Sequence, residues 1–281
     1  MIVALTGASG FIGRALADRL RAAGHEVRPL SLRASQPVPA CDAIVHLAGE
    51  PIAQRWTEEA KRRIRESRIQ ATQRLVAEIG MLSSRPQVLV SASAVGIYGS
   101  RGDEVLTESS PPGAGFLASL CSEWEEAANE GRAFGIRIVK IRIGIVLGPG
   151  GGVLARMLPA FRLGAGGRMG PGTQWMSWIH IEDLLRLFEF ALNQERVFGP
   201  FNATAPNPVT NRQFTAALAR ALHRPALLPV PAFALKLAFG EMASVLLDSQ
   251  RVLPRAPLDR GFRFRHHDLQ PALESLLGAV S

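Results

Sequence analysis

Three glycines near the amino terminus have the spacing of a loop that binds a dinucleotide diphosphate. Gly7, Gly10 and Gly13 lie in LTGASGFIG, directly after the apolar run 2–6 and at the start of a helical pattern. Glycine permits a tight turn at the first position, close approach of the backbone to a pyrophosphate at the second, and close packing of helix on strand at the third. A tight turn without a ligand is the alternative. The other loop residues predicted to contact the cofactor are Ser9, Phe11 and Ile12.

The end of the next apolar run distinguishes NADP(H) from NAD(H). An NAD site usually has Asp or Glu at this place, about 20 residues after the glycines, to bind the ribose 2′-hydroxyl. The segment HEVRPLSLRASQ ends instead with Ser31 and Arg33 and has no acid there. A hydroxyl and a guanidinium bind a 2′-phosphate, which a carboxylate would repel. We therefore predict NADP(H), with contact of Arg33 to solvent alone as the alternative.

Short apolar runs alternate with longer helical patterns over most of the chain. This order is typical of parallel strands joined by crossover helices, and it predicts an α/β fold of Rossmann type with a doubly wound parallel sheet. Ligands of such sheets bind at the carboxyl ends of the strands. The predicted strands are 2–6, 26–31, 43–47, 87–92 and 137–143.

Several helix ends have recognisable signals. Thr57, followed by two acids, predicts the start of a long helix through EEAKRRIRESRIQATQRLVAEI. Gly24 predicts the end of the helix that follows the glycine loop. Thr210 with Gln213 predicts a capping box ahead of RQFTAALARALH.

The composition of the chain changes near residue 223, where prolines precede the apolar segment 226–247. We predict an NAD(P)-binding domain over residues 1–222 and a smaller, mainly helical domain over 223–281 that serves as a substrate or lid region. Prolines and charges interrupt 226–247, so it does not predict a membrane span. We expect it to pack as a core helix, with cover of the cleft or a dimer contact as alternatives.

The composition argues against several classes of protein. The formal net charge of +8 comes mainly from arginine, scattered without basic runs, so we expect a solvated surface and no nucleic-acid face. The two cysteines, Cys41 and Cys121, have no metal-ligand spacing and predict no disulfide framework. The first residues predict a strand without a preceding signal peptide, so a cytoplasmic protein without a membrane partner is expected.

Together these segments resemble the extended short-chain dehydrogenase/reductase superfamily, in the branch that includes nucleotide-sugar epimerases. TGASGFIG resembles its phosphate loop, SASAVGIYG at 91–99 its catalytic-serine motif, and WIHIEDL a later landmark. CDAIVHLAGE at 41–50 resembles the motif that runs past the adenosine half of the cofactor, which implies contacts by Leu47, Ala48 and Gly49. More narrowly, the chain is similar to atypical epimerase-family proteins with a short C-terminal domain of unknown function.

The resemblance breaks at the catalytic residues. Typical members combine a serine, a tyrosine that transfers the proton, a lysine four residues later that lowers the tyrosine pKa, and an asparagine. On this alignment Leu117 has the tyrosine position and Cys121 the lysine position, while Arg68 has the asparagine position. Tyr98 is the only tyrosine in the chain and no lysine follows it by four residues. Of the four groups, only Ser93 remains.

Three polar residues are the candidates for the remaining chemistry. Ser93, at a strand end, could hydrogen-bond a substrate oxygen; Tyr98 is the one phenolic acid; and Glu50, after the LAG turn, is a candidate carboxylate acid or base. Their structural alternatives are a turn serine, a packed tyrosine and a surface turn. Cys121 is expected to be inert core.

The histidines predict no metal site. His266 and His267 are adjacent and would point apart in an extended segment, so they form a poor ligand pair. His180, in WIHIEDL, is expected to support the fold by hydrogen bonds.

Two functions stay open at this point. The first is an NADP(H)-dependent oxidoreductase or epimerase-like enzyme on a small molecule, with another group in place of the usual acid. The second is a protein that binds NADP(H) without turnover and acts as a sensor or regulator. A homodimer also stays open.

Overall fold

The computed structural model, which describes residues 1–32 and 36–278, is a Rossmann-type α/β fold. Its central sheet has six parallel strands in the order β10-β6-β4-β3-β1-β2. The chain reverses its direction across the sheet between β1 and β3, which is where open α/β sheets form their ligand crevice. The strands are β1 (Ile2–Thr6), β2 (Glu26–Leu30), β3 (Ala43–His46), β4 (Val88–Ala94), β6 (Arg137–Ile143) and β10 (Gly199–Ala203).

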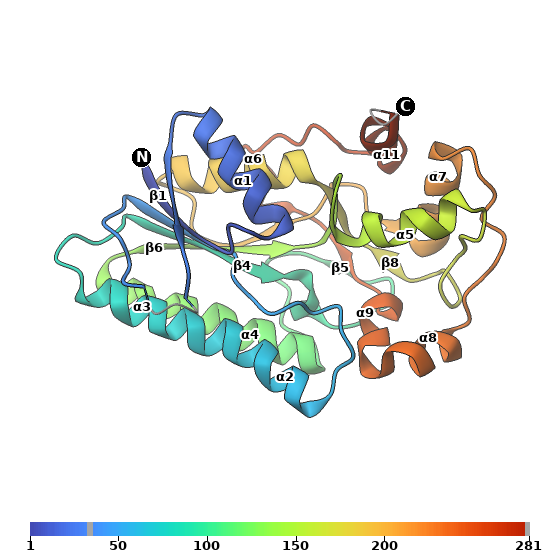
Figure 1. Ribbon diagram of the computed structural model, residues 1–281, viewed down its shortest axis with the longest axis horizontal. Helices are drawn as coiled ribbons and strands as arrows, with labels where there is room; N and C mark the ends of the chain where they lie inside the picture. Colours follow the sequence, from blue (N-terminus) through green and yellow to red (C-terminus); the bar gives the residue numbers. More distant parts are fainter. Residues whose placement is uncertain (33–35, 279–281) are drawn as a thin grey trace.

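Helices cover both faces of the sheet, so the molecule has three layers (Figure 1). Helices α1 (Phe11–Ala22) and α6 (Ile181–Asn193) lie on one face. On the other face lie α2 (Glu58–Arg65), α3 (Ala71–Met81) and α4 (Phe116–Asn129). The 3-10 turn η3 (Glu130–Phe134) follows α4 directly. Apolar side chains of the strands fill both interfaces, which is typical of parallel sheets buried on both sides.

The remaining elements lie beyond the carboxyl ends of the strands and along the C-terminal part. Short strands pair as β5 (Val105–Leu106) with β12 (Arg251–Val252), β7 (Ile145–Leu147) with β9 (Trp178–His180), and β8 (Trp175–Met176) with β11 (Val209–Thr210). The helices and helical turns are η2 (Val95–Tyr98), α5 (Gly152–Arg162), α7 (Asn211–Ala221), α8 (Ala232–Phe239), η4 (Gly240–Ala243), α9 (Ser244–Leu247), α10 (Arg255–Asp259) and α11 (Leu269–Leu277).

The five strands predicted from the sequence are confirmed, with ends that differ by at most two residues. The sixth strand, β10, was not predicted. Its sequence GPFNA has glycine, proline and asparagine, which are rare in strands. Pro200 is tolerated because β10 is an edge strand, where a missing N–H breaks no ladder on the open side.

The predicted helix signals are also confirmed. The Thr57 side chain accepts a hydrogen bond from the backbone N–H of Ala60, and Thr210 and Gln213 form a capping box. Gly24 has φ +81° just beyond α1. The long helix after Thr57 is interrupted by one π-helical turn, η1 (Glu66–Gln70), between α2 and α3. Such turns inside α-helices are frequent at functional sites.

The C-terminal segment contributes to the same core as the sheet. Phe262 and Phe264 are buried in the apolar cluster between the sheet and α1 and α6, and α11 packs on α7. β12 adds a parallel strand beside β5. The division into domains at residue 222 stays a prediction, but the last segment shares its core with the first.

The apolar segment 226–247 is not the core helix that the sequence predicted. In α8 only Leu235 is buried, while Phe233 and Leu237 are 73% and 79% exposed. The segment continues into α9, in which Val245 and Leu246 line the cavity described below. The alternative in which this segment covers the cleft therefore agrees with the structure.

We expect Phe264→Ala to lower the free energy of unfolding of the whole chain by about 3 to 5 kcal/mol, because it leaves a cavity beside the sheet. Phe233→Ala removes the same kind of side chain from an exposed position and should change the free energy of unfolding by less than about 0.5 kcal/mol. Urea unfolding followed by circular dichroism measures both. Equal effects of the two substitutions would show that the C-terminal segment does not share the main core.

Candidate functional site

A cavity of about 460 Å³ runs along the carboxyl ends of the central strands. The glycine loop before α1 lines one part of it, and the C-terminal residues 245–250 line another. Between them the walls come mainly from apolar side chains, among them Leu117, Trp124, Met169 and Trp175. This is the crevice at which open α/β sheets bind their ligands.

The glycine loop has the geometry that its spacing predicted. Gly7 has φ +70°, and a Cβ there would lie 2.9 Å from the backbone N of Ala48. A Cβ at Gly13 would lie 2.1 Å from the Gly7 carbonyl oxygen. Gly10 precedes α1 without a side-chain cap, so free N–H groups of the first turn face the cavity.

The other predicted cofactor residues divide into two groups. Phe11, Ile12 and Leu47 line the cavity together with the three glycines, whereas Ser9, Ala48 and Gly49 are not among the described residues that line it. Ser31 is exposed just beyond β2. Arg33 lies outside the described residues.

A chain of hydrogen bonds connects the strands and the helix that lie below the glycine loop. Thr6 Oγ1 accepts from the backbone N–H groups of Leu47 and Ala48, and its hydroxyl bonds to His46 Nδ1 at 2.7 Å. His46 Nε2 bonds to Thr72 Oγ1 at 2.9 Å. Burial, with a smaller contribution from Arg68, lowers the pKa of His46 to about 4. His46 is therefore neutral and links β1, β3 and α3 below the loop.

A buried ion pair lies beneath Ser93. Glu125, on α4, accepts from the Arg142 guanidinium at 2.7 and 2.9 Å and from Ser93 Oγ at 2.8 Å. Burial opposes the charge of Arg142, but the bonds to Glu125 outweigh it and keep the pKa of the guanidinium above its ordinary value. Because Ser93 also lines the cavity, its oxygen can accept a hydrogen bond there while its own hydrogen is held by Glu125.

Tyr98 does not reach the cavity, which corrects the expectation that its phenol lies in the cleft. The side chain is fully buried, and its hydroxyl donates to Asn202 at 2.7 Å and accepts from Arg142 at 2.8 Å. Burial raises the pKa of Tyr98 to about 12 despite the nearby guanidinium. The phenol therefore serves as a hydrogen-bonding partner in the core.

Glu50 is also outside the cavity wall among the described residues. Its carboxylate lies 3.9 Å from Arg63 Nε on α2, and its backbone N–H donates to Ser67 Oγ at 2.9 Å. The carboxylate is also close enough to Arg68 to act on its pKa. The structure does not bring Glu50 together with Ser93 or Tyr98.

Helix α4 places at the cavity wall Leu117 and Cys121, the two residues that the sequence alignment above matched to the tyrosine and lysine positions. Leu117 and Cys121 line the cavity with apolar atoms. Burial, helped by Glu125, raises the pKa of the Cys121 thiol to about 12, so it is not a thiolate nucleophile. The prediction that Cys121 is unreactive agrees with this environment.

Arg68 brings a positive charge to the cavity. It lies in the π-helical turn, donates to the Glu50 carbonyl oxygen at 2.9 Å and stacks 5.3 Å from the Trp124 ring. Burial lowers its pKa from the ordinary value, although a guanidinium remains charged at neutral pH. An electron-rich group of a ligand in the cavity would face this charge.

Asp248 is a cavity residue that the sequence reasoning missed. It follows α9, and its carboxyl group has no hydrogen bond or ion pair with any described residue. Burial raises its pKa above the ordinary value for aspartate. Its neighbours in the sequence are an apolar helix and a loop, which gave no signal of chemistry. Only the path of the C-terminal segment back over the cavity brings it there.

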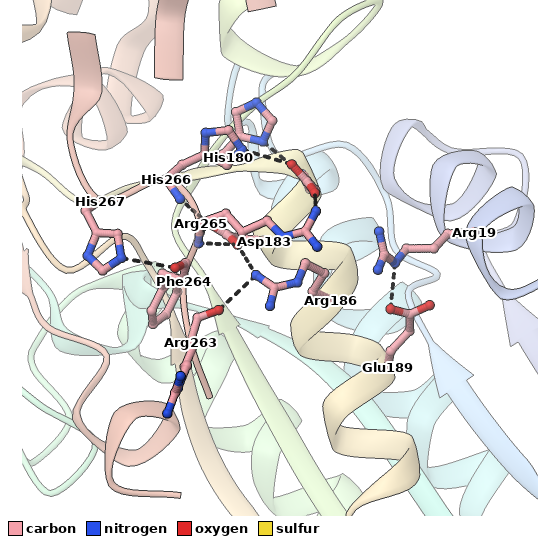
Figure 2. Close-up of polar contacts among 11 residues, drawn as sticks. Arg19, His180, Asp183, Arg186, Glu189, Arg263, Phe264, Arg265, His266 and His267 are labelled. Atoms are coloured by element: carbon pink, nitrogen blue, oxygen red, sulfur yellow. Dashed lines mark hydrogen bonds and ion pairs between the residues drawn. The ribbon is translucent and has the colours of Figure 1, made fainter. Parts of the chain in front are cut away.

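A cluster of His180, Glu182 and His266 joins the C-terminal segment to α6 (Figure 2). The candidate ligand atoms of the three residues lie within 4.8 Å of one another, which the sequence pairing of His266 with His267 did not predict. His180 Nδ1 accepts from the backbone N–H of Glu182 at 3.1 Å, so the ring proton lies on Nε2. The two imidazoles stack at 3.6 Å, so their in-plane lone pairs do not converge on one point. Among the described residues, His180 Nε2 has no hydrogen-bond partner, whereas His266 Nε2 hydrogen-bonds Glu182 Oε2 at 2.9 Å.

Asp183 also holds the C-terminal segment on α6, through several hydrogen bonds. Its buried carboxylate accepts the backbone N–H groups of Arg265 and His266 at 2.8 to 3.0 Å and binds Arg186 at 2.9 Å (Figure 2). Arg19 and Glu189 join α1 to α6 nearby at 2.6 Å. The expectation that the WIHIEDL motif supports the fold agrees with this arrangement.

Comparison with known proteins gives two family matches. Residues 3–204 match the model of the NAD dependent epimerase/dehydratase family, and residues 230–276 match a domain of unknown function, DUF1731. The chain is 43% identical to the epimerase family protein SDR39U1 homolog, chloroplastic, of Arabidopsis thaliana, over 99% of this chain and 87% of that protein. It is 39% identical to the epimerase family protein YfhF of Bacillus subtilis, over 99% of this chain and 98% of that one.

Comparison with solved structures agrees with these family matches. The crystal structure of human epimerase family protein SDR39U1 (isoform2) with NADPH superposes with a TM-score of 0.94 at 35% identity and covers all of both chains. The Thermus thermophilus UDP-glucose 4-epimerase complex with NAD has a TM-score of 0.78 at 19% identity, over 99% of this chain and 98% of that one, which shows the shared fold alone. No helix in the described part of the chain is long and apolar enough to cross a membrane.

The low pKa of His46 predicts how stability depends on pH. An unfolded histidine binds a proton below about pH 6.5, whereas folded His46 does so only below about pH 4. The free energy of unfolding should therefore be highest above about pH 6.5 and should fall as the pH is lowered toward about 4. The loss should reach on the order of 3 kcal/mol at the acid end. Urea unfolding at several pH values measures it.

The matched control for this prediction is His46→Asn. It removes the titrating group, so its stability should fall less steeply between about pH 6.5 and pH 4, even if the variant is less stable throughout. An unchanged slope in this variant would mean that other groups cause the acid sensitivity.

Proposed function

Because the chain belongs to the NAD dependent epimerase/dehydratase family, we propose that it is an NADP(H)-dependent oxidoreductase that acts on a small, largely apolar molecule. The observation that supports this most directly is the cavity that runs from the glycine loop past Ser93 to the C-terminal segment. The diphosphate of a dinucleotide fits the loop, and the nicotinamide would then lie beside Ser93.

The cofactor assignment is supported by three observations. Free N–H groups at the start of α1 face the cavity, as a diphosphate requires. The sequence at the end of β2 has Ser31 and Arg33 in place of the acid that binds an NAD ribose. The human relative of 35% identity was crystallised with NADPH. When bound, the cofactor supplies a hydride, and the protein must supply orientation and the proton.

The substrate class follows from the cavity wall. Its polar side chains are few, and several are already engaged: Ser177 Oγ donates to the Gln250 carbonyl at 2.6 Å, and the Gln250 amide donates to the Gly99 carbonyl at 3.1 Å. A sugar diphosphate has many hydroxyl and phosphate oxygens that would lose water without new partners. An aldehyde or ketone with an apolar body loses little, so we favour it over the epimerase-like substrate.

Asp248 is the group we assign to proton transfer. Its carboxyl lines the cavity without a partner among the described residues, and its raised pKa is typical of acids tuned by burial. Arg68 would stabilise negative charge that develops on a carbonyl oxygen during hydride transfer. Ser93 would orient the substrate by accepting a hydrogen bond.

A second function, NADP(H) binding without turnover, is favoured by one observation. Two of the candidate groups from the sequence, Ser93 and Tyr98, are both held in the buried network around Arg142. In that case the cofactor would act as a ligand that stabilises one conformation for a partner to recognise.

The cofactor proposal is tested by calorimetric titration with NADPH and NADH. Arg33→Ala should weaken NADPH binding about ten- to a hundredfold and NADH binding by less than about threefold, because only NADPH has the 2′-phosphate. Arg21→Ala, an exposed arginine on α1, is the matched control and should change neither. Gly10→Val should abolish binding of both, since its side chain occupies the diphosphate position. Equal loss of both cofactors in Arg33→Ala would overturn the preference for NADP(H).

The catalytic proposal is tested with a panel of apolar aldehydes and ketones while NADPH oxidation is followed. Asp248→Asn should lower turnover at least about a hundredfold and leave NADPH affinity unchanged. Protonated Asp248 is the acid, so carbonyl reduction by the unmodified protein should slow as pH rises through its raised pKa, and the variant should lack this limb.

Tyr98→Phe serves as the comparison, because its buried phenol does not reach the substrate, and turnover should stay within about threefold. Loss of turnover in Tyr98→Phe but not in Asp248→Asn would refute the assignment. Tight NADPH binding with no oxidation across the panel would favour the second function.

A further inference from the structure

Exposed apolar side chains occur on α8, in the segment before it and just after α5. Phe233 and Leu237 project from α8, and Leu227, Leu228 and Leu163 lie in the segments before α8 and after α5. Leu163, Leu227 and Leu237 are each about 80% exposed, at 84%, 81% and 79%. We call these five residues the α8 patch. In Figure 1, α8 lies at the outer edge of the molecule, away from the central sheet.

The segments that form the α8 patch are joined by backbone contacts. Ala165 forms a bridge with Ala226, and a Cβ at Gly164 would lie 3.6 Å from the Pro225 ring. The end of α5 and the approach to α8 are therefore neighbours in space. Monomeric proteins rarely expose large apolar side chains in such a group without a binding role.

The segments around the α8 patch have more cations than acids. Residues 131–181 and 196–240 contain no aspartate or glutamate. Arg162, Arg224 and Lys236 are exposed among the apolar residues, and none of them forms an ion pair with a described residue. The nearest acid along the chain, Glu241, is bound to Lys61 of α2. An approaching partner thus meets apolar side chains and cations without ion-pair partners among the described residues.

The α8 patch also adjoins the cavity. Val230 pairs with Met169, which lines the cavity, and the backbone N–H of Gly170 donates to the Val230 carbonyl at 2.8 Å. Val245 is 41% exposed and lines the cavity as well. Segments next to the α8 patch therefore also contribute residues to the cavity wall.

We infer that the α8 patch docks the protein onto the surface of an anionic lipid bilayer. Phenylalanine and leucine side chains enter the boundary between headgroups and acyl chains, while arginine and lysine remain among anionic headgroups. A second copy of this chain fits less well. A symmetric dimer would bring Arg162, Arg224 and Lys236 against the same cations of the other copy.

This mode of binding differs from the one that the sequence analysis considered. The prolines and charges of 226–247 argue against a helix that spans the bilayer, and no described helix can do so. Interfacial docking requires only an exposed apolar group of residues with nearby cations. It is also independent of catalysis, so it stands whichever function the cavity has.

The experiment is co-sedimentation of the full-length protein with vesicles. Vesicles of phosphatidylcholine with phosphatidylglycerol should bind the protein at about 0.1 M salt, and vesicles of phosphatidylcholine alone should bind it at least about tenfold more weakly. The double variants Phe233→Ser/Leu237→Ser and Arg224→Gln/Lys236→Gln should each lose at least about tenfold in affinity. Met81→Ser, at an equally exposed residue on α3, is the matched control and should bind normally.

Circular dichroism and thermal unfolding establish that the variants are folded, which their exposed positions favour. The inference is overturned if the protein does not sediment with anionic vesicles. It is also overturned if the Phe233→Ser/Leu237→Ser variant binds them as well as the unmodified protein. A stable dimer in analytical ultracentrifugation that this variant dissociates, without vesicle binding, would instead identify the α8 patch as a contact between copies.

Discussion

The charge of Arg142 inside the protein is the constraint on which the rest of the site depends. A buried guanidinium is tolerated only when it is paired and its hydrogen-bond donors are satisfied. Glu125 provides the pairing from α4, and Tyr98 provides a further acceptor from the turn after β4. These bonds fasten β4, β6 and α4 to one another directly below the cavity. A group whose proton is held in this network, as that of Ser93 is, can still accept a hydrogen bond in the cavity but does not donate one there.

The helix beside this network presents an apolar wall to the cavity. Leu117 and Cys121 of α4 both line it. The serine keeps its place but donates its hydrogen inward to Glu125. Among the described residues, the cavity surface retains the cation of Arg68 and the unpartnered carboxyl of Asp248. In the proposed function, the proton donor and the positive charge therefore come from elements that surround the sheet.

The sequence predicted the parts of this protein that depend on local rules. The glycine loop, the capping box at Thr210 and the inner strands all follow from residue type and spacing. The sequence did not predict the features that depend on contacts between residues distant in the chain. The strand at 199–203 has poor local propensity and forms because β6 offers a free edge. Tyr98 was a candidate acid with a packed tyrosine as the alternative, and only the folded chain shows Asn202 and Arg142 beside it. Asp248 enters the site from a segment distant in sequence.

The late position of Phe262 and Phe264 in the chain has a consequence for biosynthesis. The sheet forms from residues that leave the ribosome early, yet the space beside α6 that these two rings fill stays open until the last part of the chain has been translated. Asp183 likewise waits for the backbone N–H groups of Arg265 and His266. The nascent protein therefore exposes an unfilled apolar surface from the synthesis of α6 until residues 262–264 have been added, and a chaperone that shields such surfaces would act on it at that stage.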